Sequence, residues 1–141
     1  MGGSTQKLRA VAVVLVRGER VLALRRSAHK DAAPGAWETV SGRAEAGEAL
    51  EATALREAEE ETGLPVLLDA APVDRYEAKR GEAAMEVTVF AARVQRNDAP
   101  LRLSTEHDAA RWVTADEFRA LTPFARLADA VDLALMRLRA G

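Results

Sequence analysis

The apolar residues at the start of the chain fall into two short blocks. Leu8 to Arg17 is rich in β-branched residues, and Arg20 to Arg26 is a shorter block of the same kind. Only Gly18 and Glu19 separate the blocks, so the pattern predicts an antiparallel hairpin with a largely buried first strand. Residues 27–36 are polar and include a proline and a glycine, which predicts a loop after the second strand.

Three later segments have the residue pattern of helices. They are Glu48 to Thr62, Thr114 to about Leu121, and a last segment from Pro123 to Leu138. The first is dominated by good helix formers, and Gly63 supplies its stop. The second begins at a capping box, in which the Thr114 hydroxyl and the Glu117 carboxylate satisfy backbone donors. Proline at the first helical position favours the start of the third.

Three more segments predict strands. They are Val66 to Tyr76, Met85 to Val94 and Ala110 to Val113, with Gly81 in the turn between the first two. The 141 residues are 48% hydrophobic and 30% charged, which is typical of one compact globular domain. We therefore expect residues 1–141 to form a single domain with one core.

The composition excludes several classes of protein. A formal net charge of −2 gives no overall attraction to nucleic acid or anionic lipid, so we expect neither as a partner. The longest apolar run, Ala10 to Val16, is too short to span a bilayer, and Met1 to Lys7 lacks the apolar stretch of a signal peptide. The absence of cysteine excludes disulfides, thiolate zinc sites and a cysteine nucleophile, and it fits a reducing cytoplasm.

The first predicted helix carries an acidic face. At about 100° per residue, Glu57, Glu60 and Glu61 lie on one side of it. Like charges at this spacing destabilise a helix by roughly 0.2–0.5 kcal/mol per pair. A divalent cation such as Mg²⁺ would reverse that effect, because it takes carboxylate oxygens as ligands. For an arbitrary run of glutamates, a solvated acidic face is the more frequent explanation.

The residues around the acidic face favour the metal site. They match every fixed position of the Nudix box, Gly-x5-Glu-x7-Arg-Glu-U-x-Glu-Glu-x-Gly-U, where U is apolar. The matching residues are Gly42, Glu48, Arg56, Glu57, Glu60, Glu61, Gly63 and Leu64, with Ala58 a mild departure at the first U position. On this motif the chain is identified as a member of the Nudix hydrolase family. The order of the predicted elements also resembles that family, which implies an α/β fold, an α/β/α sandwich with a mixed β-sheet.

The resemblance implies a divalent metal cofactor, Mg²⁺ or Mn²⁺. Glu57, Glu60 and Glu61 would bind it, together with a main-chain carbonyl near Ser41. The implied reaction is the hydrolysis of a pyrophosphate bond in a nucleoside di- or triphosphate derivative. Water attacks phosphorus and releases a nucleoside monophosphate or another phosphorylated moiety.

Other box residues would support the metal ligands. Glu48 and Arg56 would contact each other, or Arg56 would contact a neighbouring box glutamate, and so orient the ligands. Gly42 and Gly47 would allow the tight loop that brings backbone near metal and phosphate. Ser41-Gly42 stands where many family members have two glycines, and Gly63 completes the motif.

The candidate catalytic residues are Arg56, Glu60, Glu61 and Glu106. The base that takes the proton of the attacking water is either a box glutamate, Glu60 or Glu61, or Glu106 in a later loop. Sequence leaves these alternatives open, because it gives no distance to the water.

Three residues near the second strand are candidates for substrate contact. Arg25 or Arg26 would hold a phosphate through the planar guanidinium, with Arg26 better matching the family, although solubility at a strand end explains them equally well. Trp37 would stack on a base, but packing against the core is its more frequent use.

The substrate remains open at this stage. Glu106-His107, followed by Trp112, resembles a stretch of several Nudix subfamilies that include pterin triphosphate pyrophosphatases, and we assign His107 a supporting role only. A noncatalytic Nudix-like domain that senses nucleotides is the alternative from another class, although such domains usually lose box residues. The resemblance also allows a homodimer.

Overall fold

The computed structural model describes residues 7–30, 32–80, 83–96 and 98–140. The expected turn at Gly81 and the expectation for Met1 to Gln6 lie outside this part of the chain. The elements follow the order β1 (Leu8–Arg17), β2 (Arg20–Arg26), β3 (Trp37–Glu38), β4 (Val40–Arg43), α1 (Leu50–Thr62), β5 (Val66–Leu68), β6 (Asp74–Arg80), β7 (Ala83–Val94), β8 (His107–Val113), α2 (Ala115–Leu121) and α3 (Ala125–Ala140).

β1 is the central strand of one mixed sheet. It runs parallel to β7, with pairs from Leu8–Met85 to Val16–Arg93, and antiparallel to β2 and β4. β2 also pairs with β3 and β8, while β7 pairs with β5 and β6. Parallel neighbours need a crossover connection, and α1 lies within the connection between β1 and β7. The predicted hairpin and the mixed sheet are confirmed.

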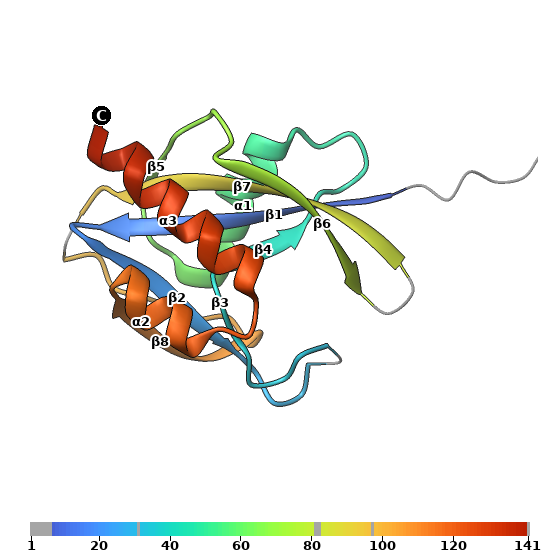
Figure 1. Ribbon diagram of the computed structural model, residues 1–141, viewed down its shortest axis with the longest axis horizontal. Coiled ribbons are helices and arrows are strands. Elements are labelled where there is room, and N and C mark those ends of the chain that lie inside the picture. Colours follow the sequence, from blue (N-terminus) through green and yellow to red (C-terminus); the bar gives the residue numbers. More distant parts are fainter. Residues whose placement is uncertain (1–6, 31, 81–82, 97, 141) are drawn as a thin grey trace, which may run out of the picture.

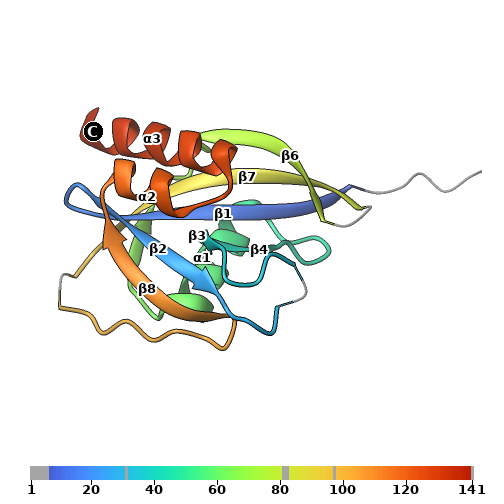
Figure 2. The ribbon, with the colours of Figure 1, turned by 60° about the horizontal axis from the view of Figure 1, so that its bottom comes forward.

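Helices cover both faces of this sheet. α2 and α3 lie on one face and α1 lies on the other (Figures 1 and 2). Side chains of β1 alternate between the two layers: Val14 belongs to the apolar cluster with α3, whereas Val13 and Leu15 belong to the cluster with α1. Burying such a side chain contributes roughly 1.5–3 kcal/mol, so β1 holds the layers together. The α/β/α sandwich implied by the family resemblance is confirmed.

The single strand predicted over Val66 to Tyr76 is wrong. The structure divides it into β5 and β6, which pair with different parts of β7. Between them, Asp69 accepts a hydrogen bond from the Ala71 backbone, and Pro72 has no N–H to give to a ladder. Arg137 of α3 donates to Asp69 and to the Ala71 and Pro72 carbonyls, which fixes the break.

The predicted helices are present with shifted starts. α1 begins at Leu50 rather than Glu48 and ends, as predicted, before Gly63, whose φ of 68° is left-handed. α3 begins at Ala125 rather than Pro123. The capping box is confirmed, because the Thr114 hydroxyl accepts from the Glu117 backbone while the Glu117 carboxylate accepts from the Thr114 backbone.

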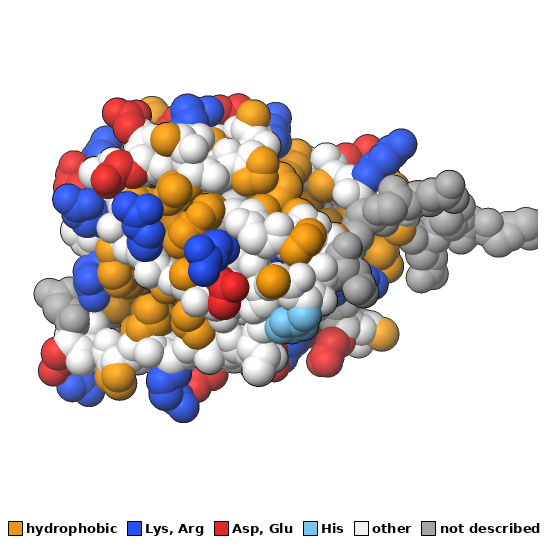
Figure 3. Space-filling view, turned by 90° about the horizontal axis from the view of Figure 1, so that it is seen from below, with side chains coloured by type: hydrophobic (Ala, Val, Ile, Leu, Met, Phe, Trp, Pro, Cys, Tyr) orange, Lys and Arg blue, Asp and Glu red, His pale blue; other side chains and the backbone are white. Residues whose placement is uncertain are grey.

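The outer surface mixes charged and apolar groups. On the face shown in Figure 3, apolar side chains lie between basic and acidic ones. The large exposed apolar residues are Leu55, Leu67, Leu101, Leu103, Phe124, Leu133 and Met136. Among the described residues, none of the helices has the length and apolar character needed to cross a bilayer.

Candidate active site

A pocket of about 710 Å³ opens beside β1, β4 and β6. Its charged side chains include Arg26, Lys30, Glu38, Glu57 and Glu106. Its apolar and aromatic side chains include Tyr76, Met85, Val87, Phe124 and Leu127. A pocket that combines an apolar wall with a few converging charged groups is the usual form of a small-molecule site.

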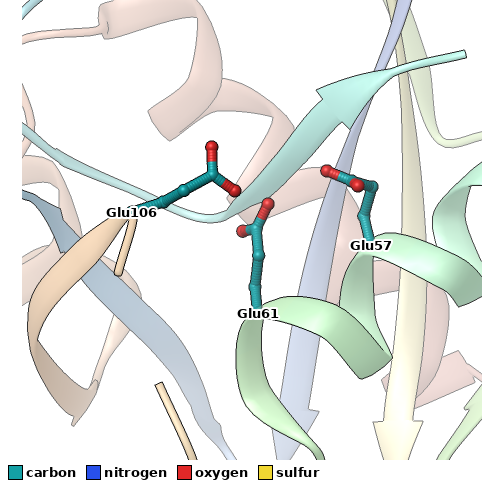
Figure 4. Close-up of side chains that lie close together, drawn as sticks. All are labelled: Glu57, Glu61 and Glu106. Carbon is teal, nitrogen blue, oxygen red and sulfur yellow. The ribbon is translucent and has the colours of Figure 1, made fainter. Parts of the chain in front are cut away.

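Three carboxylates converge at this pocket. Glu57 and Glu61 lie one turn apart on α1, and Glu106 directly precedes β8; each offers an oxygen within 4.8 Å of the other two. The three side chains point toward one another beside β4 (Figure 4). Packing α1 on the sheet therefore brings the acidic face of the helix to a residue far along the chain.

Burial sets the electrostatics of the two helix carboxylates. Glu57 is 7% exposed and Glu61 is 1% exposed. Loss of hydration raises the pKa of Glu57 to about 7, and burial together with the neighbouring Glu57 charge raises the pKa of Glu61 further. Two ionised carboxylates are costly here without a cation.

Glu106 lies in a different environment. Lys30 donates to its carboxylate at 2.9 Å, and this hydrogen bond lowers the pKa of Glu106. Loop 27–36 and the segment before β8 are also joined through the backbone, where the Ser27 N–H donates to the Glu106 carbonyl at 2.9 Å. The third carboxylate is therefore held in place by its own partners.

The fourth predicted acid, Glu60, lies outside this convergence. Its side chain is 55% exposed and lies 3.3 Å from Arg56. The structure thus groups Glu57 and Glu61 with Glu106, and the role of Glu60 as a metal ligand stays a prediction.

Arg56 ties the loop before α1 to the acidic face of the helix. It donates to both oxygens of Glu48 at 2.9 Å, to Glu57 at 2.8 Å and to the Arg43 carbonyl at 3.1 Å. Both contacts expected of Arg56 are present. The hydrogen bond from Arg56, followed by one from the Glu45 backbone, lowers the pKa of Glu48 to about 2. Glu48 therefore stays ionised over the whole working range of pH.

Gly42 has no room for a side chain. A Cβ at this position would lie 1.7 Å from a carboxylate oxygen of Glu57. Gly47 differs, because its φ of 75° is left-handed and no atom crowds it. Ser41, which directly precedes Gly42, donates its backbone N–H to Glu61 at 3.3 Å. The role of a main-chain carbonyl near Ser41 stays a prediction.

Comparison with known proteins assigns the family. The NUDIX domain model matches residues 6–132. This chain belongs to the Nudix family.

The chain is also similar to two relatives and to a solved structure. The Nudix chain is 38% identical over 135 residues to an octanoyltransferase of Myxococcus xanthus, covering 88% of the chain and 36% of that protein. It is 38% identical over 95 residues to an asymmetrical bis(5'-nucleosyl)-tetraphosphatase of Sus scrofa, covering 62% of each. It therefore spans less than two thirds of either relative. The fold is similar to that of a C. elegans Ap4A hydrolase, with a TM-score of 0.82, 18% identity and coverage of 95% and 99%.

The two candidate arginines of this Nudix domain have different surroundings. Arg26 is 4% exposed, pairs with Glu38 at 3.1 Å and lines the pocket, and its buried Nη2 has no hydrogen-bond partner in the described part of the chain. Arg25 is exposed, pairs with Asp108 at 2.7 Å and lies outside the pocket lining. Of the two, only Arg26 is placed to meet a ligand in this pocket.

Trp37 lies away from the pocket lining. Its ring packs against the cluster beneath α3, its carbonyl accepts from the Thr122 hydroxyl at 2.7 Å, and Arg25 lies 5.8 Å from the ring centre. Packing against the core, the more frequent use of such a residue, describes its position here.

Among the pocket residues, Lys30 and Glu38 have no role assigned from the sequence. Lys30 is one of many basic residues in the sequence. It lies in a predicted loop, and no motif around it indicates a function. Glu38 is a charged residue directly after Trp37, and only the structure shows that the short strand β3 buries it. For Tyr76, the strand-like segment predicts a place in the core or in the wall of a site, and pairing of β6 with β7 brings it to the pocket wall.

Proposed function

We propose that this Nudix domain hydrolyses a pyrophosphate bond in a nucleoside di- or triphosphate derivative. Water attacks phosphorus, and a nucleoside monophosphate or another phosphorylated moiety is released. The observation that carries the proposal is the convergence of Glu57, Glu61 and Glu106 at a pocket with both charged and apolar walls. Family membership and the similarity to a tetraphosphatase of nucleotides support it.

The acidic cluster fits a divalent cation. Its members offer three oxygens within 4.8 Å of one another, and two of them have a pKa raised by burial, so a cation would relieve the cost of ionising them. Glu57, Glu61 and Glu106 would hold Mg²⁺ or Mn²⁺, and the family motif adds Glu60 and the carbonyl near Ser41. Once bound, the metal would neutralise charge on the phosphate oxygens and lower the pKa of a bound water.

Among the candidate bases, the structure favours Glu61 over Glu106. The Glu106 carboxylate already accepts a hydrogen bond from Lys30 at 2.9 Å, which lowers its pKa and makes it the weaker proton acceptor. Glu60 is exposed and paired with Arg56, so it is the weakest of the three candidates.

The remaining pocket residues suit a nucleotide. Arg26 and Lys30 line the pocket, and Lys30 places an ammonium group beside the acidic cluster, so the pocket offers positive charge to phosphate oxygens. Tyr76 and Phe124 line the pocket and offer aromatic surface for a ring. A soluble small molecule of this kind fits the cytoplasmic location that we expect.

A substrate screen tests the proposal. The panel holds a dinucleoside tetraphosphate, nucleoside triphosphates, ADP-ribose, UDP-sugars and dihydroneopterin triphosphate, each with Mg²⁺ and with EDTA. We expect Mg²⁺-dependent release of phosphorylated product from at least one. Tight nucleotide binding without turnover would instead indicate the noncatalytic, sensing alternative.

The base is located with three variants at saturating Mg²⁺. We compare the single-turnover rates of Glu60→Gln, Glu61→Gln and Glu106→Gln. The largest loss of rate is expected in Glu61→Gln. A full rate in Glu61→Gln would move the base to one of the other two residues.

A further inference from the structure

The buried ring of His107 lies between two glutamates, Glu38 and Glu61. Its side chain is 2% exposed, and Nε2 lies 2.8 Å from Glu38 Oε2. The same oxygen accepts a hydrogen bond from Arg26 at 3.1 Å, so Glu38 is the ionised partner of a guanidinium. An ionised carboxylate only accepts hydrogen bonds, and Nε2 therefore carries the proton and donates it to Glu38.

The other ring nitrogen of His107 faces Glu61. Nδ1 is buried, has no hydrogen-bond partner among the described residues and lies 3.8 Å from Glu61 Oε1. That separation is longer than a hydrogen bond, and a movement of about 1 Å would close it. The Glu61 carboxylate is held on another side by the Ser41 N–H. The imidazole ring, fixed at Nε2, thus directs its free nitrogen at the most deeply buried member of the acidic cluster.

We propose that His107 is a positioning residue, which fixes the Glu61 carboxylate through Nδ1 while Glu38 and Arg26 hold the ring. The geometry that supports this role is the ring held at Nε2 and the buried Nδ1 directed at Glu61. Carboxylates that ligate a metal are themselves held by hydrogen bonds, and loss of such a partner costs 10–100-fold in metal affinity in other proteins. The inference rests on the proposed function, since it assigns His107 to the same acidic cluster.

Two isosteric variants separate this role from simple core packing. Asn at position 107 places an amide nitrogen near Nδ1, on the side of Glu61, whereas Gln places one near Nε2, on the side of Glu38. We expect His107→Gln to weaken Mn²⁺ binding by about 10-fold or more, and His107→Asn to stay within about 3-fold of the wild type. The measurement is Mn²⁺ titration followed by electron paramagnetic resonance, with kcat and KM for the best substrate. The proposal predicts that kcat falls with His107→Gln while KM changes little.

The second histidine of the chain supplies the matched control. His29 is exposed and lies outside the pocket lining, so His29→Gln is expected to match the wild type in both assays. Equal Mn²⁺ affinity in His107→Gln and His107→Asn, or the reverse order, would overturn the proposal, because a packing role does not distinguish the two nitrogens.

A measurement on the wild type covers the case in which neither variant folds. In ¹⁵N-histidine spectra, Mg²⁺ is expected to shift the His107 Nδ1 resonance while Nε2 keeps its signal, and an unmoved Nδ1 would overturn the proposal. Wild-type protein that binds Mn²⁺ and shows the variant pattern, yet hydrolyses no phosphoanhydride, supports the role of His107 and contradicts the proposed activity alone. Wild-type protein that binds no Mn²⁺ overturns both.

Discussion

The Glu57 side chain lies against the backbone of β4 at Gly42, where there is no room for a Cβ. The φ of Gly42 is not in the left-handed region, so space rather than conformational freedom requires glycine here. The carboxylate of Glu57 is also held by Arg56 from the other side. A residue without any functional group thereby helps to set the position of a candidate metal ligand.

Replacing this glycine with alanine should displace the carboxylate. A Cβ 1.7 Å from an oxygen of Glu57 forces the side chain to move, so Gly42→Ala is expected to weaken Mn²⁺ binding by roughly 10–100-fold, the range seen when the support of a ligand is lost. Gly18→Ala is the control, because its cost is backbone strain at a φ of 62° in a turn with no atom nearby. If both variants lowered the melting temperature but neither changed Mn²⁺ affinity, the assigned position of Glu57 would be wrong.

For single residues, the sequence predicts the site contacts between members of one local motif, and few others. The contacts of Arg56 with Glu48 and Glu57 were foreseeable because they join residues within one box. Glu38 and Lys30 were not, since their place at the pocket depends on a short strand and an irregular loop. No local pattern specifies either of them.

Among the elements, α1 and the loop before it act as one unit. Arg56 joins them through Glu48, Glu57 and the Arg43 carbonyl. Its planar guanidinium meets both oxygens of Glu48, and a lysine ammonium cannot reproduce that geometry.

Arg56→Lys is therefore expected to weaken Mn²⁺ binding by about 10-fold or more while the protein stays folded. Arg119→Lys is a matched control, because Arg119 also bridges two carboxylates, Asp129 and Asp132, and lies outside the pocket. Titration with Mn²⁺ and a thermal melt of both variants supply the comparison. If Arg56→Lys bound Mn²⁺ as tightly as the wild type, the hydrogen bonds of Arg56 would contribute only to stability.

Element boundaries follow from sequence where apolar periodicity is strong. β1, β2 and the end of α1 agree with prediction because long apolar runs and a terminal glycine mark them. β3 and β4 escape prediction because Trp37-Glu38 and Val40-Ser41-Gly42-Arg43 alternate too briefly to stand out, and their pairing with β2 and β1 makes them strands. Val66 to Tyr76 is misjudged because the contacts of Arg137, which fix the break, come from the far end of the chain.

For the whole molecule, folding and metal binding should be linked through pH. Burial raises the pKa of Glu57 and Glu61, so the metal-free folded protein holds these protons more tightly than the unfolded chain. These two groups stabilise the fold fully below the ordinary value of 4.5, and this stability is lost as pH rises through about 7, the folded value for Glu57, and beyond it for Glu61.

A divalent cation should reverse this trend, because it binds the ionised carboxylates. We expect Mg²⁺ to raise the melting temperature more at about pH 8 than at about pH 5.5. In the double variant Glu57→Gln, Glu61→Gln, both the pH dependence from these groups and the effect of Mg²⁺ should disappear. An equal rise at the two pH values would show that Mg²⁺ binds elsewhere.

Metal-dependent hydrolysis at the acidic cluster is tested most directly by the rate of hydrolysis of the best substrate. The rate is measured as a function of Mg²⁺ concentration, for the wild type and for Glu61→Gln. We expect no turnover in EDTA, saturation with Mg²⁺ in the wild type, and a loss of more than about 100-fold in the folded variant, since Glu61 would be a direct ligand. Turnover that persists in EDTA, or a variant as active as the wild type, would contradict metal-dependent hydrolysis at the acidic cluster.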